Sequence, residues 1–271
     1  MVAGNRHPRP RFCYISPMLT RAILPGAIPL PRVIGHRGAA EAAPENTLAS
    51  FRAAKNQGAA WVEFDTKLSA DDQPFLLHDD NLDRTSNGHG PARALNYDDL
   101  RRLDAGSWKA PQFAGERMPL LAEALALFQE LDLQFNLELK PCPGRARETA
   151  AIVLAELKRL WPRSRPQPLL SSFVLESLEI SRDQAPEIPR GLLLEGHPVN
   201  WLDLAQNLKA VVVNIGDRAA TPEWIAEIKA EGYGILVYTV NDAARAQQLI
   251  GWGVDGVFSD APGRILAAVA Q

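Results

Sequence analysis

The sequence has few of the features that mark several large classes of protein. Its 271 residues include only two cysteines, Cys13 and Cys142, and neither lies in a CxxC motif, so we expect neither a disulfide framework nor a cysteine zinc site. No apolar run approaches the roughly 18 residues that a membrane span requires. The net charge of −3 supplies no basic field for nucleic acid. These absences favour a protein of a reducing, cytoplasmic compartment, with no nucleic-acid partner and no stable membrane insertion.

The first 31 residues differ from the rest of the chain. They carry several arginines ahead of an apolar stretch, an order that is also found in secretory signals, and a signal would make the protein periplasmic. However, Arg21 and four prolines interrupt the apolar part. We therefore predict a disordered N-terminal extension over 1–31, or translation starting at Met18, and a single domain over 32–271.

Short apolar runs alternate with amphipathic stretches from residue 32 onward. Runs of this length, rich in Val, Ile, Leu and Phe and bounded by Gly, Pro or polar residues, predict buried strands. The eight predicted strands span 32–35, 61–68, 134–140, 168–173, 190–195, 210–214, 234–240 and 256–260. A ninth run over 74–78 follows the second after a hairpin-length turn and is predicted to be an added antiparallel strand.

The intervening stretches predict helices. The predicted helices span 47–57, 119–131, 146–160, 175–182, 199–207, 222–231, 242–250 and 262–269. Asn46 is the expected N-cap of the first, and prolines 119, 222 and 262 suit the first turn of three others. Eight such units predict an α/β fold, a (β/α)8 TIM barrel. The alternative is an open doubly wound sheet, but no GxGxxG loop follows the first strand.

One connection is much longer than the others. After the added hairpin strand, residues 79–118 are rich in Asp, Asn, Gly and Arg and precede the next predicted helix. Insertions of this length are usually functional, so we predict a small cap over the barrel after strand two.

Charged residues occupy strands that should be apolar on both faces. The second predicted strand carries Glu63 and Asp65, and the third carries Glu138 and Lys140. Three buried carboxylates on adjacent strands require a compensating cation. Oxygen-only ligands favour one hard divalent ion, Mg²⁺ or Ca²⁺, and the sequence does not distinguish them. The alternative is that these acids only form structural ion pairs with the neighbouring Lys140 and Arg37.

Two histidines lie at strand ends near the same predicted mouth. His36 ends the first strand and His78 ends the hairpin strand, which suits general acid–base catalysis. Arg37 and Lys140 add positive charge beside the carboxylates. A divalent cation with Arg and Lys predicts an oxyanion substrate, phosphate above all, and the histidines then suggest phosphoester cleavage.

Several segments resemble the glycerophosphodiester phosphodiesterases. The motifs are GHRGAAEAAPENTLASF, VEFDTKLSADDQPFLLHDDNLDRTSNG, LELKP, LDAGSWKAPQFAGERMPLLAEAL, YTVND and DGVFSDAP, in family order from about residue 32 to 265. The resemblance implies a TIM barrel with a cap after strand two. It also implies metal-dependent hydrolysis of a glycerophosphodiester to sn-glycerol 3-phosphate and an alcohol.

The same resemblance assigns roles to individual residues. It implies metal ligation by Glu63, Asp65 and Glu138, and acid–base catalysis by His36 and His78. It implies phosphate binding by Arg37 and Lys140, support of the first loop by Glu45, and an aromatic substrate wall at Tyr238. A neighbouring glycerol hydroxyl would be the nucleophile, and the reaction would pass through a cyclic phosphate.

Two residues depart from the family pattern, and two other functions remain open. Tyr238 stands where the family commonly has tryptophan, which could alter alcohol preference, and Ser259 replaces a common threonine. A phospholipase-type enzyme would need an apolar surface at the mouth of the barrel, and the insert offers Trp108 and Phe113 for it. A non-catalytic phosphoester-binding barrel would not need both histidines. The oligomeric state and the preferred alcohol cannot be predicted from the sequence.

Overall fold

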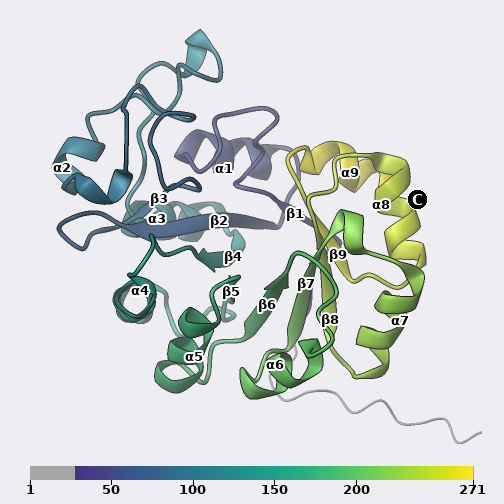
Figure 1. Ribbon diagram of the computed structural model, residues 1–271. Coiled ribbons are helices and arrows are strands. Elements are labelled where there is room, and N and C mark those ends of the chain that lie inside the picture. Colours follow the sequence, from purple (N-terminus) through teal and green to yellow (C-terminus); the bar gives the residue numbers. More distant parts are fainter. Residues whose placement is uncertain (1–27, 271) are drawn as a thin grey trace, which may run out of the picture.

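The computed structural model describes residues 28–270, and in it eight parallel strands close into a barrel surrounded by helices (Figure 1). Closure is made by β1 (Val33–Gly35), which pairs with β2 (Trp61–Leu68) on one side and β9 (Gly256–Ser259) on the other. The other parallel strands are β4 (Gln134–Leu139), β5 (Leu169–Ser172), β6 (Arg190–Leu194), β7 (Val212–Gly216) and β8 (Gly234–Tyr238). The predicted TIM barrel is therefore confirmed.

The helices alternate with the strands near the predicted segments, and the last of them follows β9. They are α1 (Leu48–Asn56), α3 (Leu121–Leu131), α4 (Ala146–Leu160), α5 (Leu175–Gln184), α6 (Trp201–Asn207), α7 (Pro222–Ala230), α8 (Ala243–Gly251) and α9 (Pro262–Val269). None of the helices within residues 28–270 is both long and apolar enough to cross a membrane.

Two predictions about the residues that begin helices are wrong, and the helix predicted from residue 199 also begins two residues later, at Trp201. The N-cap of α1 is Thr47, whose hydroxyl accepts from the Ser50 amide at 3.3 Å, and not Asn46. Asn46 has a left-handed backbone with φ 57°, and its side chain bonds Asp65 in the barrel instead. Pro119 also lies before its helix, because α3 begins at Leu121. Pro222 and Pro262 do occupy the first turns of α7 and α9, where the missing N–H costs nothing.

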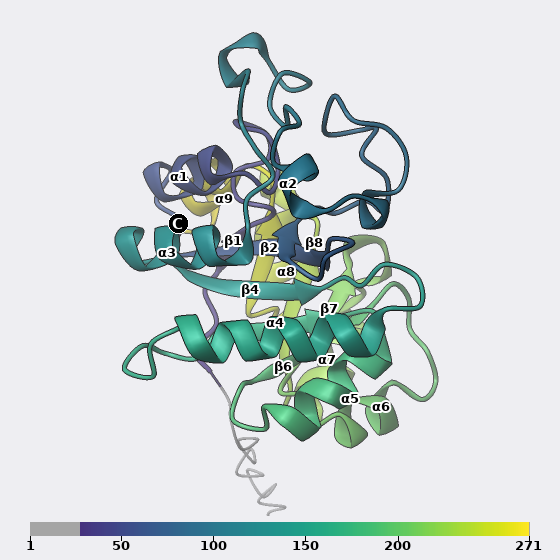
Figure 2. The same ribbon diagram turned by 90° about the vertical axis from the view of Figure 1, so that its left-hand side faces the viewer.

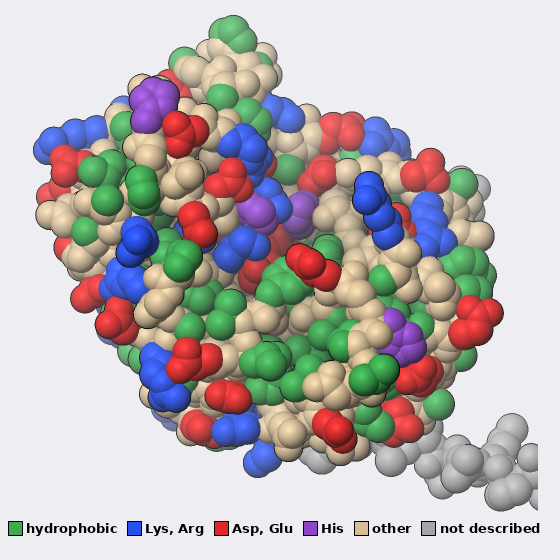
Figure 3. Space-filling model, in the orientation of Figure 1, with side chains coloured by type: hydrophobic (Ala, Val, Ile, Leu, Met, Phe, Trp, Pro, Cys, Tyr) green, Lys and Arg blue, Asp and Glu red, His purple; other side chains and the backbone are tan. Residues whose placement is uncertain are grey.

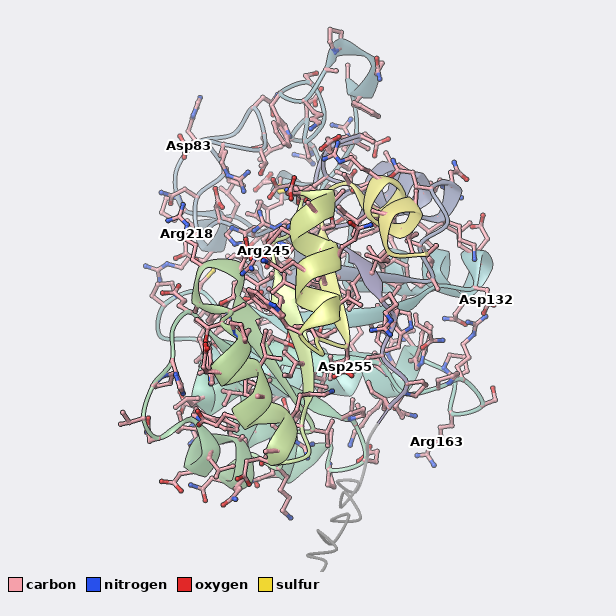
Figure 4. The ribbon with its side chains drawn as sticks, turned by 90° about the vertical axis from the view of Figure 1, so that its right-hand side faces the viewer. Asp83, Asp132, Arg163, Arg218, Arg245 and Asp255 are labelled. Atoms are coloured by element: carbon pink, nitrogen blue, oxygen red, sulfur yellow. The ribbon has the colours of Figure 1, made fainter. Side chains whose placement is uncertain are left out.

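Charged side chains on the outer layer pair with one another. Arg245 of α8 donates to Asp217 at 2.7 Å, and Lys229 of α7 donates to Asp255 at 2.6 Å. Figure 4 labels one residue of each pair, Arg245 and Asp255. All four side chains are only partly buried, so water still screens both pairs and each contributes about 1 kcal/mol.

The barrel interior is apolar at its amino-terminal end. Ile34, Trp61, Leu169, Leu236 and Phe258 form a buried cluster there. The adjoining segment before β1 packs against this cluster through two further apolar side chains, those of residues 28 and 30. Residues 1–27 of the predicted extension lie outside the described residues. Because the apolar layer closes this end, the cavity can open only at the carboxyl ends of the strands.

A hairpin and a long insert rise above the strands between β2 and α3 (Figure 2). Strand β3 (Pro74–Leu76) pairs antiparallel with β2, as predicted. Residues 79–118 follow and contain η1 (Ala92–Ala94), α2 (Tyr97–Leu100) and η2 (Pro111–Phe113). Leu82, Leu100 and Met118 pack with Phe75 in a small core of their own. The insert is therefore a packed unit seated on the hairpin.

Candidate active site

A cavity of about 600 Å³ opens at the carboxyl ends of the strands. In Figure 3 its hollow is bordered by histidine and charged side chains on one side and by hydrophobic ones on the other. Seven of the nine residues predicted for the site line it: His36, Arg37, Glu63, His78, Glu138, Lys140 and Tyr238. Asp65 lies fully buried beneath them, and Glu45 supports Arg37 from outside the cavity.

The loop after β1 turns sharply to present its polar side chains. Arg37 has φ 51°, and its amide donates to Glu63 Oε2 at 3.0 Å. Its carbonyl accepts from the Ser50 hydroxyl at 2.7 Å and the Asn46 amide at 3.1 Å. A side chain at Gly35 would come within 2.4 Å of the Gly38 carbonyl oxygen, so the tight turn requires glycine there. The uncommon conformation of Arg37 is therefore held by bonds from three elements.

Both histidines are oriented in the same way. His36 Nδ1 lies 2.7 Å from Asp260 Oδ1, and His78 Nδ1 lies 2.7 Å from Asp79 Oδ1. Because a carboxylate only accepts hydrogen bonds, each Nδ1 is the donor, and Nε2 of the neutral ring remains available for a proton. Burial lowers the pKa of His78, which favours that neutral ring. This is the arrangement that general acid–base catalysis requires.

The carboxylate partners are themselves fixed. Asn241 donates to Asp260 Oδ2 at 2.6 Å and accepts from the Asp260 amide at 2.8 Å. Arg84 of the insert donates twice to Asp79, at 2.7 and 3.0 Å, and so lowers the pKa of that carboxyl below its usual range.

Arg84 also connects the insert to the first loop. It donates twice to Glu45, each bond 2.7 Å long, and Glu45 accepts from Arg37 at 2.6 Å. Burial alone would raise the pKa of Glu45, but the two arginines lower it. Planar two-point pairing of this kind fixes geometry as well as charge. Glu45 thus ties Arg37 to Arg84, and through Arg84 to the partner of His78.

Three buried carboxylates meet at the base of the cavity. One oxygen from each of Glu63, Asp65 and Glu138 lies within 4.8 Å of the others. Burial and the charges of its two neighbours raise the pKa of Glu63 well above its usual value, and burial and Asp65 raise that of Glu138 to about 7. Burial would also raise the pKa of Asp65, but Arg37 and Lys140 lower it. The cluster holds more negative charge than it can stabilise alone, so these residues fit a divalent cation.

Two cations stand beside the carboxylates. Lys140 Nζ donates to Glu138 at 2.9 Å and lies 3.5 Å from Asp65, while Arg37 Nε lies 3.4 Å from Asp65. Arg37 Nε is buried and has no hydrogen-bond partner among the described residues. Such ion pairs are what we expect if the charged strand residues have only a structural role. Neither cation forms a side-chain ion pair with Glu63, and burial together with the charges of Asp65 and Glu138 raises the pKa of that carboxyl well above its usual value.

The structure adds residues that the sequence interpretation missed. Asp260, Asp79 and Arg84 position the histidines, as described above. Lys67 of β2 lines the cavity, is 1% exposed and donates to Asp80 at 2.8 Å. The sequence could have indicated Lys67, because it follows Glu63 and Asp65 at two-residue intervals and alternate residues of one strand face the same side.

The proposed apolar surface on the insert is small. Trp108 is 39% exposed and donates from its indole to the Ala105 carbonyl, while Phe113 is only partly exposed. A larger apolar area lies at the opposite rim, where Phe173, Val174 and Leu175 are all exposed.

Comparison with known proteins gives a consistent result. Residues 36–264 match the model of the glycerophosphoryl diester phosphodiesterase family. A glycerophosphodiester phosphodiesterase of Bacillus subtilis is 34% identical over 245 residues, covering 84% of this chain and 83% of the relative. A Caldanaerobacter subterraneus enzyme of the same name is 30% identical, covering 88% of this chain and 98% of the relative.

Solved structures agree in fold and sequence. An Oleispira antarctica phosphodiesterase in complex with the product sn-glycerol-3-phosphate is 40% identical and superposes with a TM-score of 0.87, covering 89% of this chain and 98% of that one. A Silicibacter pomeroyi protein described as a glycerophosphoryl diester phosphodiesterase is 27% identical with a TM-score of 0.80, covering 90% and 95%.

Proposed function

The chain belongs to the glycerophosphoryl diester phosphodiesterase family, and we propose that it hydrolyses glycerophosphodiesters to sn-glycerol 3-phosphate and an alcohol. The observation that carries the proposal is the pair of carboxylate-oriented histidines in the cavity that also holds the three carboxylates. The product bound by the Oleispira relative supports the choice of substrate.

Glu63, Asp65 and Glu138 would hold one divalent cation, Mg²⁺ or Ca²⁺. When bound, the cation supplies charge that polarises the phosphoryl group. Arg37 and Lys140 would bind phosphate oxygens, and their position on the cavity wall next to these carboxylates supports this role. Arg37 offers a planar guanidinium and Lys140 a point charge, so the two would define the phosphate's position together.

His36 and His78 would transfer the protons. In the route that the family resemblance implies, the neighbouring glycerol hydroxyl attacks phosphorus while one imidazole Nε2 accepts its proton. The other imidazole, protonated, donates to the oxygen of the departing alcohol as the P–O bond breaks. Water then opens the cyclic phosphate to glycerol 3-phosphate, and the same groups act in the reverse sense.

The insert over residues 79–118 would act as the cap of this site. Its Arg84 bonds both Glu45 and Asp79, so its position is coupled to that of Arg37 and His78. A cytoplasmic location stays a prediction, as does the periplasmic alternative, because residues 1–27 lie outside the described part of the chain.

A phospholipase-type activity is the second candidate. The exposed Phe173, Val174 and Leu175 beside the cavity favour it more than Trp108 does, because the first two also line the cavity. An acyl chain on the glycerol would extend over these side chains. The non-catalytic alternative gains nothing from the structure, since binding alone does not require two oriented imidazoles.

A coupled glycerol 3-phosphate dehydrogenase assay tests the proposal. The panel holds glycerophosphodiesters of choline, ethanolamine and glycerol, together with a lysophospholipid, each with and without Mg²⁺ or Ca²⁺. Release from a diester, abolished in His78→Ala, is expected. No release from any diester with either ion would refute the proposed function. Choline released only from the lysophospholipid, followed with a separate choline oxidase assay, would favour the second candidate.

A further inference from the structure

One wall of the cavity consists of two aromatic side chains and one acidic side chain, which phosphate binding does not use. It consists of Phe173 after β5, Glu195 after β6 and Tyr238 at the end of β8. We propose that these three side chains form a subsite for a cationic alcohol, so that the enzyme selects glycerophosphodiesters whose head group carries an ammonium charge. This inference rests on the proposed function and names the substrate class.

Glu195 is the unusual member of the wall. Among residues 28–270 its carboxylate forms no ion pair and no side-chain hydrogen bond, although it borders the cavity. The acids on the other side are engaged: Glu138 accepts from Lys140, Asp79 from Arg84 and Asp80 from Lys67. Glu195 therefore offers a negative charge that no side chain of the described protein neutralises.

The backbone holds Glu195 next to Tyr238. The Tyr238 hydroxyl donates to the carbonyl of Leu194 at 2.8 Å, one residue before Glu195. Gly216 separates the two strands, and a Cβ there would lie 3.3 Å from the Glu195 carbonyl and 3.7 Å from the Tyr238 hydroxyl. The glycine thus leaves room for the Tyr238 hydroxyl beside the backbone of Glu195. Burial and the charge of Glu195 raise the pKa of Tyr238, which agrees with that proximity.

Two aromatic rings complete the wall. Phe173 and Tyr238 pack edge to face, with centroids 5.7 Å apart and planes at 89°. Perpendicular rings form a corner, and the negative faces of aromatic rings attract ammonium groups, quaternary ones included. Phe173 is 36% exposed, so part of its ring remains available to a ligand.

A cation of the protein, Lys140, already lies beside this wall. Its Nζ lies 5.7 Å from the centre of the Phe173 ring, but it is also bonded to Glu138 and close to Asp65. A diester with its phosphate at Arg37 and Lys140 would direct its alcohol along this wall toward Glu195. The phosphate would then lie between Lys140 and the ammonium group and reduce their repulsion.

An apolar alcohol could also contact the rings, so the experiment isolates the charge. We would measure kcat/KM for glycerophosphocholine and for glycerophosphoglycerol with the wild type and Glu195→Gln. Glu195 is exposed, and loss of an exposed ion pair should lower kcat/KM for the choline diester about three- to fivefold, mainly through KM. The neutral glycerol diester should change less than twofold. Glu223→Gln, the same charge change on exposed α7, serves as the control.

A second measurement uses inhibitors of glycerophosphoglycerol hydrolysis. Choline should inhibit the wild type more strongly than its neutral isostere 3,3-dimethylbutan-1-ol, and Glu195→Gln should remove most of the difference. Equal effects of the variant on both diesters, or equal inhibition by both alcohols in the wild type, would overturn the subsite. Absence of any diester hydrolysis by the wild type would instead refute the proposed function.

Discussion

Replacement of Asp260 by asparagine tests whether the orientation of His36 matters for turnover. Asp260 uses one oxygen for His36 Nδ1 and the other for Asn241 Nδ2, at 2.7 and 2.6 Å. Asn241 cannot rotate its amide freely, because its oxygen already accepts from Ser259 and from the Asp260 amide. An asparagine at 260 must therefore turn its own amide toward one of two donors.

The expected loss follows from this geometry. If the new amide faces His36, Nδ1 must accept, and the proton moves to Nε2, where it blocks the base. Loss of the charge-assisted bond alone removes about 1–2 kcal/mol, or about 5- to 30-fold in rate. Acid–base catalysis by one group contributes about 10²–10⁴-fold, which sets the upper limit. We expect kcat to fall about 100-fold with KM nearly unchanged.

The assay is release of glycerol 3-phosphate, together with thermal unfolding to show that the variant is folded. Asp242→Asn is the control: Asp242 caps α8 by accepting from the Arg245 amide at 2.7 Å, and asparagine caps about equally well. This variant removes the same charge nearby and should retain wild-type kcat. A folded Asp260→Asn enzyme with kcat within threefold of the wild type would refute the orienting role.

Three further changes have defined outcomes. Arg84→Lys can keep at most one bond to each of its two partners, so kcat/KM should fall about tenfold; an unchanged value would show that the insert does not position the site. Glu63→Ala should lose Mg²⁺ or Ca²⁺ binding in calorimetry together with activity, and undiminished binding would contradict the ligand set. Burial lowers the pKa of His78, so its neutral form persists to lower pH than that of an exposed histidine. If His78 is the imidazole that acts as base, the acid limb of the kcat/KM profile should lie below about pH 6.5, and a midpoint above it would contradict that assignment.

The strands were predictable because strands buried on both faces must be apolar. The bounds of β2 match the prediction, and the α4 bounds match as well. The first helix start was not predictable from local sequence, since Asn46 and Thr47 are both good N-caps. Only the three-dimensional structure shows that Asn46 is needed at Asp65, which leaves the cap to Thr47.

The site was predictable where charge conflicts with burial. Glu63, Asp65 and Glu138 interrupt strands that should be apolar, so a site was expected there before the fold was known. Asp260 and Arg84 do not conflict with burial in this way, because Asp260 comes at the very end of a predicted strand and Arg84 lies in the insert, where charged residues are ordinary. Asp260 lies 224 residues from its histidine, and only closure of the barrel between β1 and β9 makes them neighbours.

The way the insert is attached has a consequence for how this barrel could change over time. Leu76 donates to the Pro119 carbonyl at 3.0 Å, and Phe75 and Leu120 form an antiparallel bridge, so the two ends of the insert are clasped together at its base. Glu63, Asp65 and Glu138 lie on the barrel strands, outside the insert and its paired ends. The sequence and length of the insert can therefore change during evolution with little effect on the barrel. The one requirement is that an arginine of the insert still bonds Glu45 and Asp79.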